Sequence, residues 1–111
     1  MAAFGEIDLT NVNQVGLSGE HPLDIAAVRG DLEEIYALLD GGADINAPGE
    51  LGYTALHEAV GQGHVDAVHV LLEFGARTDI RNEFGDTAAD IASMRKRDEI
   101  LALLRSKGQA D

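Results

Sequence analysis

Residues 52–72 read GYTALHEAVGQGHVDAVHVLL, and this stretch predicts two short helices joined by a tight turn. The Thr54 hydroxyl is placed to cap the free backbone N–H groups at the start of the first helix. Gly61 and Gly63 are expected to stop that helix, because glycine enters the left-handed conformation without a Cβ penalty. The apolar face of the second helix is formed at helical spacing by Val65, Val68, Leu71 and Leu72. We expect Gly75 to close it, and residues 76–83 show no helical periodicity.

The same landmarks recur every 33 residues along the chain. The sets that keep this step are Gly19, Gly52 and Gly85; Gly42, Gly75 and Gly108; Ala26, Ala59 and Ala92; and Leu38, Leu71 and Leu104. Chance does not hold so many positions in phase, so the chain is a tandem array. One helix pair cannot bury its own apolar stripe, whereas stacked pairs make that stripe continuous. The repeat therefore predicts an all-α solenoid.

The unit resembles the ankyrin repeat, whose pattern reads roughly G-x-T-P-L-H-x-A-A-x-x-G-H-x-E-x-V-x-x-L-L-x-x-G-A-D-x-N-A. Residues 19–27 read GEHPLDIAA and residues 42–47 read GADINA, while residues 52–59 read GYTALHEA. The resemblance implies stacked helix-turn-helix pairs with β-hairpin-like fingers between them. It divides the chain into a partial N-terminal capping segment (1–17), two ankyrin repeats (18–50 and 51–83) and a degenerate C-terminal capping repeat (84–111). Thr10-Asn11-Val12-Asn13 supports the first assignment, because it lies one period before Ala43-Asp44-Ile45-Asn46.

Three departures from the pattern carry expectations of their own. In the first unit His21 stands where the pattern has the capping Thr, and Asp24 stands where it has His, so the two partners look exchanged. We therefore expect a contact between them across the first helical turn. Residues 87–90 (TAAD) have the spacing of a capping box, with Asp90 in place of Glu or Gln. Lys96 stands where the other units have Gly30 and Gly63. Because a left-handed non-glycine residue costs about 1 kcal/mol, we expect this turn to differ in shape.

The charge of the chain restricts its partners. The formal net charge is −12, and residues 1–50 hold ten acids against one base, Arg29. Nucleic acid binding needs clustered cations, and anionic membranes repel such a chain, so neither is an expected partner. Two interpretations of the acidity stay open: a solvated surface, or a field that steers a basic protein partner.

Composition indicates where the protein works. There is no cysteine, and no apolar run approaches the ~18 residues of a membrane span. The opening segment MAAFGEIDLTNVNQ has two acids and no Lys or Arg, which argues against a secretory signal. We therefore expect a cytoplasmic protein that is a monomer by itself.

Nothing in the sequence predicts catalysis. The serines lie outside any nucleophile-elbow pattern, and every glycine run is explained by a repeat turn, so no phosphate loop and no cofactor are expected. A metal-dependent role through His57, His64 and His69 is a lesser alternative. His57 and His64 fall on positions where the family uses histidine for capping and turn bonding. His69 lies five residues after His64, off the i, i+4 spacing of paired helical ligands.

The resemblance also implies a binding face, because ankyrin partners usually bind the concave surface lined by the fingers and the first helix of each pair. Carried over position by position, this predicts a set of partner-binding residues: Glu20, Arg29, Glu50, Leu51, Tyr53, Gln62, Glu83, Phe84, Asp86, Met94 and Arg95. An apolar centre with a polar rim is typical of a binding anchor. Leu51 and Phe84 have a second interpretation, in which they pack between neighbouring fingers and only stabilise the stack.

The sequence thus predicts a non-catalytic protein-protein interaction module that acts by occupying a surface, as an inhibitor, an antidote or an adaptor. A stabilising subunit of a larger complex is the alternative. Fold does not fix which of these holds.

Overall fold

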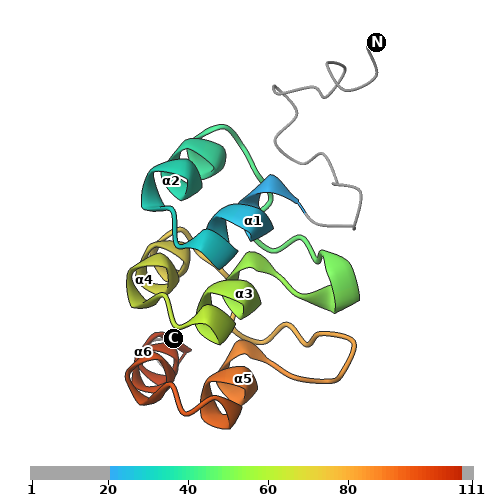
Figure 1. The fold of residues 1–111 in the computed structure, drawn as a ribbon, viewed down its shortest axis with the longest axis vertical. Helices are drawn as coiled ribbons and strands as arrows, with labels where there is room; N and C mark the ends of the chain where they lie inside the picture. Colours follow the sequence, from blue (N-terminus) through green and yellow to red (C-terminus); the bar gives the residue numbers. More distant parts are fainter. Residues whose placement is uncertain (1–20, 109–111) are drawn as a thin grey trace.

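The computed structural model describes residues 21–108, which form three helix pairs stacked one above the other (Figure 1). The pairs are α1 (Pro22–Arg29) with α2 (Leu32–Asp40), α3 (Ala55–Gln62) with α4 (Val65–Glu73), and α5 (Ala88–Met94) with α6 (Asp98–Gly108). No β-strand occurs among the described residues, and the all-α solenoid is confirmed. The expected capping segment over residues 1–17 lies outside them. No helix between residues 21 and 108 combines the length and apolarity needed to cross a bilayer.

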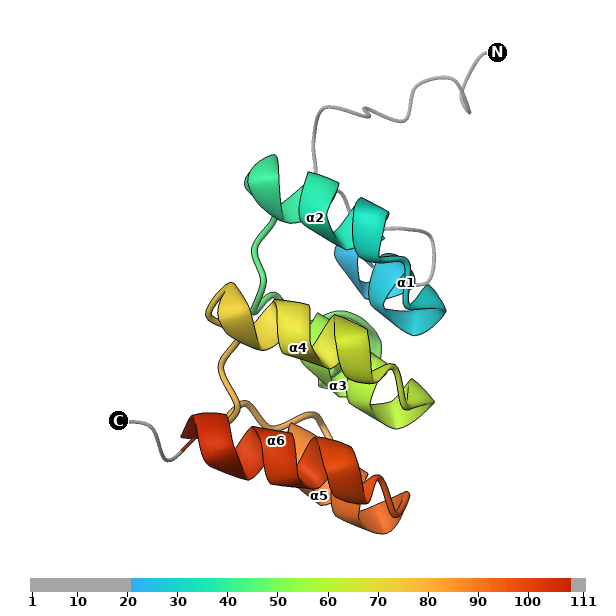
Figure 2. The ribbon, with the colours of Figure 1, turned by 90° about the vertical axis from the view of Figure 1, so that its left-hand side faces the viewer.

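The helices form two layers. Helices α1, α3 and α5 make an inner layer beside the fingers, and α2, α4 and α6 make an outer layer, as the turned view in Figure 2 shows. Each inner helix buries an alanine at the same position of the repeat, namely Ala26, Ala59 and Ala92. Larger buried side chains such as Ile35, Leu71 and Leu104 come from the outer helices. Small residues let the inner helices approach closely while the branched residues fill the space between the layers.

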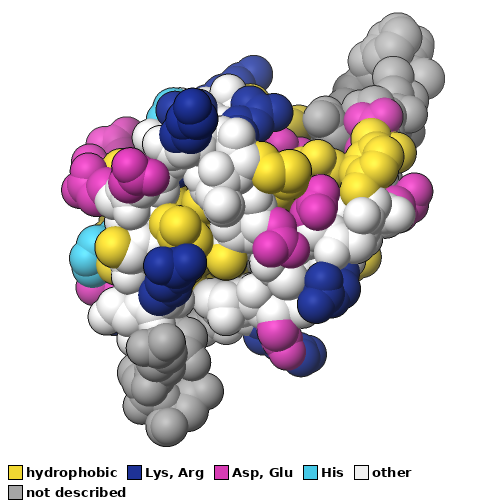
Figure 3. Space-filling model, turned by 90° about the horizontal axis from the view of Figure 1, so that it is seen from below, with side chains coloured by type: hydrophobic (Ala, Val, Ile, Leu, Met, Phe, Trp, Pro, Cys, Tyr) yellow, Lys and Arg dark blue, Asp and Glu magenta, His cyan; other side chains and the backbone are white. Residues whose placement is uncertain are grey.

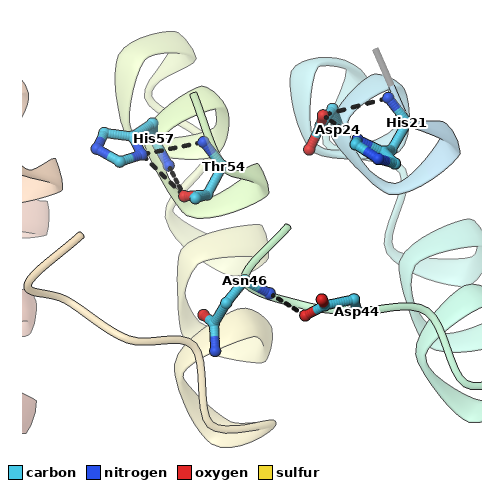
Figure 4. Close-up of polar contacts among 6 residues, drawn as sticks. All are labelled: His21, Asp24, Asp44, Asn46, Thr54 and His57. Atoms are coloured by element: carbon cyan, nitrogen blue, oxygen red, sulfur yellow. Dashed lines mark hydrogen bonds and ion pairs between the residues drawn. The ribbon is translucent and has the colours of Figure 1, made fainter. Parts of the chain in front are cut away.

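Reciprocal caps begin the inner helices, as predicted (Figure 4). The His57 backbone N–H donates to Thr54 Oγ1 at 3.4 Å, and the Thr54 N–H donates back to His57 Nδ1 at 3.1 Å. Thr87 and Asp90 repeat this box in the third unit. In the first unit the His21 N–H donates to Asp24 Oδ2 at 3.2 Å, with His21 Nδ1 3.4 Å from the same oxygen. The expected exchange of partners is therefore confirmed.

Two expectations about the turns are wrong. Gly61 does not stop α3; it lies inside the helix, and only Gly63 is left-handed, with φ +77°. The turn at Lys96 does not differ in shape, because Lys96 adopts φ +59°. The Lys96 N–H bonds to Ser93 and the Arg97 N–H to Ala92, in the pattern that Gly63 and His64 make one period earlier. Hydrogen bonds from the N–H groups of the turn to carbonyls at the end of α5 thus hold Lys96 in a conformation that its own side chain disfavours.

Each of the two described fingers is a tight loop whose base is closed by a backbone hydrogen bond. Gly49 N–H donates to the Tyr53 carbonyl at 2.8 Å, and Asn82 N–H donates to the Asp86 carbonyl at 2.9 Å. A short 3₁₀ turn, η2 (Glu50–Gly52), forms the tip of the first of these fingers. The fingers are hairpin-like in this sense and project from the inner layer on the right of Figure 1.

Candidate functional site

His57 ties the finger of the third unit to the second unit. Its side chain is 1% exposed. Nδ1 accepts the Thr54 backbone N–H, which can only donate, so the ring proton is on Nε2. Nε2 donates to the Asp86 carbonyl at 3.1 Å, across 29 residues of chain. Burial lowers the pKa of His57 below its usual 6.5, against the opposing effect of the bond to Asp86. The base of the finger is therefore fixed by a neutral imidazole.

The two described fingers pack backbone to backbone. The Glu83 N–H donates to the Leu51 carbonyl at 2.9 Å. A Cβ placed on Gly52 would lie 2.9 Å from the Glu83 nitrogen, so only glycine permits this approach. Asn82 shapes the second finger, because its side-chain oxygen accepts the N–H groups of Phe84 and Asp86. The fingertips are thus held rigidly in relation to each other.

Two large apolar side chains point outward from these tips. Leu51 is 46% exposed and Phe84 is 64% exposed, one period apart. Glu50 and Glu83 beside them are exposed, and Asp86 is partly exposed. Hydrophobic side chains gather on the right of Figure 3, the side of the fingers, with acidic side chains next to them. We call these five residues, Glu50, Leu51, Glu83, Phe84 and Asp86, the fingertip patch.

Leu51 is held in a strained conformation. Its φ is +58°, in the left-handed region that branched apolar side chains disfavour. Such outliers are a reason to look for function, because glycine or asparagine would fit the same turn at lower cost. The strain does not bury the side chain.

The other predicted binding residues are divided between two places. Tyr53 is half-buried with its ring edge-on to His57, at a centroid distance of 5.7 Å, so it supports the finger from behind. The remaining described residues lie at the opposite ends of the inner helices from the fingers: Arg29, Gln62, Met94 and Arg95. Arg95 Nη1 donates to the Gly61 carbonyl at 3.3 Å. Glu20 lies outside the described residues.

Sequence reasoning expected turn bonding from His64, but it missed that Arg97 makes the equivalent contact between the turns one period later. His64 Nε2 donates to the Val28 carbonyl at 2.9 Å, and a Cβ on Gly30 would lie 2.8 Å from the His64 ring. Arg97 repeats this one period later, with Nη2 3.1 Å from the Gly61 carbonyl and the guanidinium over Gly63. The 33-residue step from His64 to Arg97 was the available signal. It is weak, because the two side chains differ.

The histidines have structural roles in this arrangement. His57 and His64 each use Nε2 to bind a carbonyl of another unit, while the exposed His69 lies 3.7 Å from Glu73. Within residues 21–108 no three His, Cys, Asp or Glu side chains are grouped so that they could hold a metal ion.

Comparison with known proteins agrees with this architecture. Among curated proteins, none matches the chain in sequence. The family model for ankyrin repeats matches residues 23–111 in three copies, which is most of the chain. Ankyrin repeats are generally protein-protein interaction modules, and the family is typically not enzymatic. The chain belongs to the ankyrin repeat family.

Proposed function

We propose that this protein is a non-catalytic module that binds a partner protein on its concave surface, with the fingertip patch as the anchor. It acts by occupying a surface of that partner, as an inhibitor, an antidote or an adaptor. Specific interfaces bury about 800 Å² on each side around a few apolar anchors.

The outward placement of Leu51 and Phe84 is the observation that carries the proposal. If these side chains only stabilised the stack, they would be expected to bury most of their surface between the fingers. Instead they are 46% and 64% exposed, and the close approach of the fingers is made by Gly52 and the backbone. Apolar surface left in water gives the monomer little stability, whereas covering it with a partner gains about 25 cal/mol per Å².

The charges around the anchor favour a basic partner. Glu50, Glu83 and Asp86 surround the two apolar side chains, and the nearby Arg81 guanidinium is bound to the Gly85 carbonyl at 2.7 Å. A net charge of −12 adds long-range attraction for a cation-rich surface. Binding that depends on this attraction weakens as salt rises.

The experiment is a pull-down from lysate with three baits: the natural chain, a Leu51→Asn/Phe84→Ala variant and a Phe74→Ala control. Asn suits the left-handed turn at position 51, so the double variant keeps its fold. Phe74 is also an exposed aromatic, but it lies at the end of α4 in the outer layer, against Tyr36. Circular dichroism establishes that all three baits have the same helical content.

A protein retained by the natural chain and by the control, and lost from the double variant, supports the proposal. Its affinity for the double variant is expected to fall by about 30-fold, which corresponds to about 2 kcal/mol. Equal retention by all three baits would show that the partner binds another surface.

A further inference from the structure

The stack of fingers ends in an open backbone edge. The Leu51 carbonyl accepts the Glu83 N–H at 2.9 Å, and the α-carbon of Gly52 packs against the backbone of Asn82 and Glu83. One period later, Phe84 has a carbonyl and Gly85 an α-carbon at the same positions, although Phe84 is not left-handed as Leu51 is and the Gly85 carbonyl accepts Arg81 Nη1 at 2.7 Å. No hydrogen bond to the Phe84 carbonyl is found within residues 21–108, and no atom lies within 4 Å of a Cβ placed on Gly85.

At the same end of the stack, the turn between α5 and α6 does not offer an open surface as the finger does. Gly30 and Gly63 receive the side chains of the following unit at 2.8 and 2.9 Å from the position of a Cβ. The equivalent residue of the last unit is Lys96, which has the same left-handed backbone but carries a side chain. Met94 stands at the position of Gly61 and is 62% exposed. A further helix pair stacked on α5 and α6 would have to displace these side chains.

The third unit thus exposes backbone groups at its finger but carries side chains on the surface where the helices of another repeat would pack. This arrangement suits a single extended segment better than another folded repeat. Such a segment can lie on the flat face of Gly85 and donate an N–H to Phe84, as Glu83 does to Leu51. Pairing of an extended chain with an exposed backbone edge is a common mode of peptide recognition.

The charges decide between a partner and a second copy of this chain. A second copy carries the same net charge of −12 and the same acidic tips, so like charges oppose its approach. Lys and Arg side chains on an extended segment would instead meet Glu83, Asp86 and, on the neighbouring finger, Glu50, which outnumber the Arg81 guanidinium held on the Gly85 carbonyl. Apolar side chains at alternate positions would meet Leu51 and Phe84.

We propose that the Phe84–Gly85 edge binds an extended, Lys- or Arg-rich segment of the partner protein through a backbone hydrogen bond to the Phe84 carbonyl. This inference rests on the proposed function and names the chemistry of the partner at that surface. The specific contact is then made by the backbone of the last finger. The predicted binding residues at the far ends of the inner helices, Arg29 and Gln62, take no part in it.

The test uses the full chain and a random 12-residue peptide library displayed on phage. Selected peptides are synthesised, and their affinity is measured by fluorescence anisotropy, first unmodified and then with each backbone N–H methylated in turn. We expect the selected sequences to alternate Lys or Arg with apolar residues. Methylation at one position should weaken binding by about tenfold, because it removes the donor to Phe84. The carbonyl ¹³C resonance of Phe84 should shift on binding.

The charge contribution has a matched control. Glu50→Gln/Glu83→Gln should weaken the peptide about fivefold and reduce the salt dependence of its affinity. The control Glu33→Gln/Glu34→Gln neutralises two exposed acids on α2 in the same way. It should change neither the affinity for the peptide nor the salt dependence of that affinity.

Several results would overturn the inference. These are a library that yields no binding peptide, selected peptides without Lys or Arg, tolerance of N-methylation at every position, or equal effects of the two Glu→Gln pairs. Peptides whose resonance shifts centre on Gln62 and Arg95 would also reject the edge, while binding at the concave surface would stand. A doubled mass in light scattering, abolished by Phe84→Ala, would identify a second copy as the occupant. The pull-down judges the proposed function separately, because it depends on side chains and uses no peptide.

Discussion

The second and third units have nearly the same backbone but differ in what lies next to them. Gly52 and Gly85 both have a left-handed φ, yet a Cβ on Gly52 would meet the following finger, whereas a Cβ on Gly85 would meet nothing within 4 Å beyond its chain neighbours. Gly63 and Lys96 make the same turn, but the Arg97 guanidinium packs on Gly63, whereas Lys96 is exposed. The comparison shows that local sequence sets the conformation of a repeat, while its neighbours decide how much each residue contributes to stability.

The largest difference is expected between His57 and its equivalent one period later, Asp90. His57→Ala removes a buried ring, takes away the acceptor of the Thr54 N–H and removes one of the two donors to the Asp86 carbonyl, so it should lower the free energy of unfolding by about 3 kcal/mol. Asp90 is exposed and serves only the local capping box, so Asp90→Ala should cost about 0.5–1 kcal/mol. Urea denaturation of the two variants measures both values. Equal losses would show that the bond from His57 to Asp86 adds nothing to stability.

Gly52→Ala and Gly85→Ala compare a covered finger with an open one. Both substitutions force alanine into a left-handed conformation, at a cost of about 1–2 kcal/mol. At position 52 the new Cβ also meets the Glu83 backbone nitrogen at 2.9 Å and pushes the fingers apart. Gly52→Ala should therefore cost about 1 kcal/mol more than Gly85→Ala, since it also breaks the bond from Glu83 to Leu51. Thermal unfolding monitored by circular dichroism tests the order, which is contradicted if Gly85→Ala is the more damaging.

Acid should weaken the second unit before the third. The pKa of His57 lies below 6.5 in the folded chain because the ring is buried, so the unfolded state takes up its proton first as pH falls. The stabilisation from neutral His57 is complete above pH 6.5 and is lost as pH falls from there toward the lower pKa of the folded state, by at most about 1.4 kcal/mol per pH unit.

The stabilisation from Asp90 is lost at a lower pH than that from His57. The backbone N–H of Thr87 lowers the pKa of Asp90 below 3.8, so its contribution to stability is present above that pH and is lost only in stronger acid.

The prediction for His57 is tested by urea midpoints at pH 7.5 and 5.5. The difference between the two midpoints should be smaller in His57→Asn than in the natural chain. His69→Asn, which changes an exposed histidine, should keep the natural difference. A natural chain whose midpoint does not move between these pH values would contradict the prediction.

The smallest effect concerns the turn that ends the stack. Lys96→Gly relieves a left-handed lysine and should raise the free energy of unfolding by about 0.5–1 kcal/mol, after the greater freedom of glycine in the unfolded chain is subtracted. Lys107→Gly, near the end of α6, is a control expected to destabilise by about 0.5–1 kcal/mol. A loss of stability in Lys96→Gly would mean that the lysine side chain makes a contact worth more than its strain.

Sequence reasoning predicted the helix pairs and their caps, and it named the residues of the fingertip patch, whose role in binding stays a prediction. The reciprocal caps of Thr54 and Thr87, the contact between His21 and Asp24, and the helix pairs follow from spacings of three and four residues, which hydrogen bonding within a helical turn dictates. The turn at Lys96 was mispredicted, because the hydrogen bonds from the turn to the end of α5 override a preference of about 1 kcal/mol. Gly61 was mispredicted because glycine inside a helix carries no local mark that distinguishes it from a helix stop.

What the sequence by itself determined is the repeat: its period, its helices, its caps and the family to which it belongs. These depend on contacts within one unit or on the recurrence of the same residues. Tertiary structure alone decided that Leu51 and Phe84 face water, that Tyr53 supports His57 and that Arg95 and Arg97 bind the preceding unit. Those outcomes depend on which surfaces a neighbouring unit covers. Most equivalent positions share their local geometry, Leu51 and Phe84 being an exception because only Leu51 is left-handed. Only the stacked structure shows which side chain has a neighbour, and a neighbour gives a buried contact its energy.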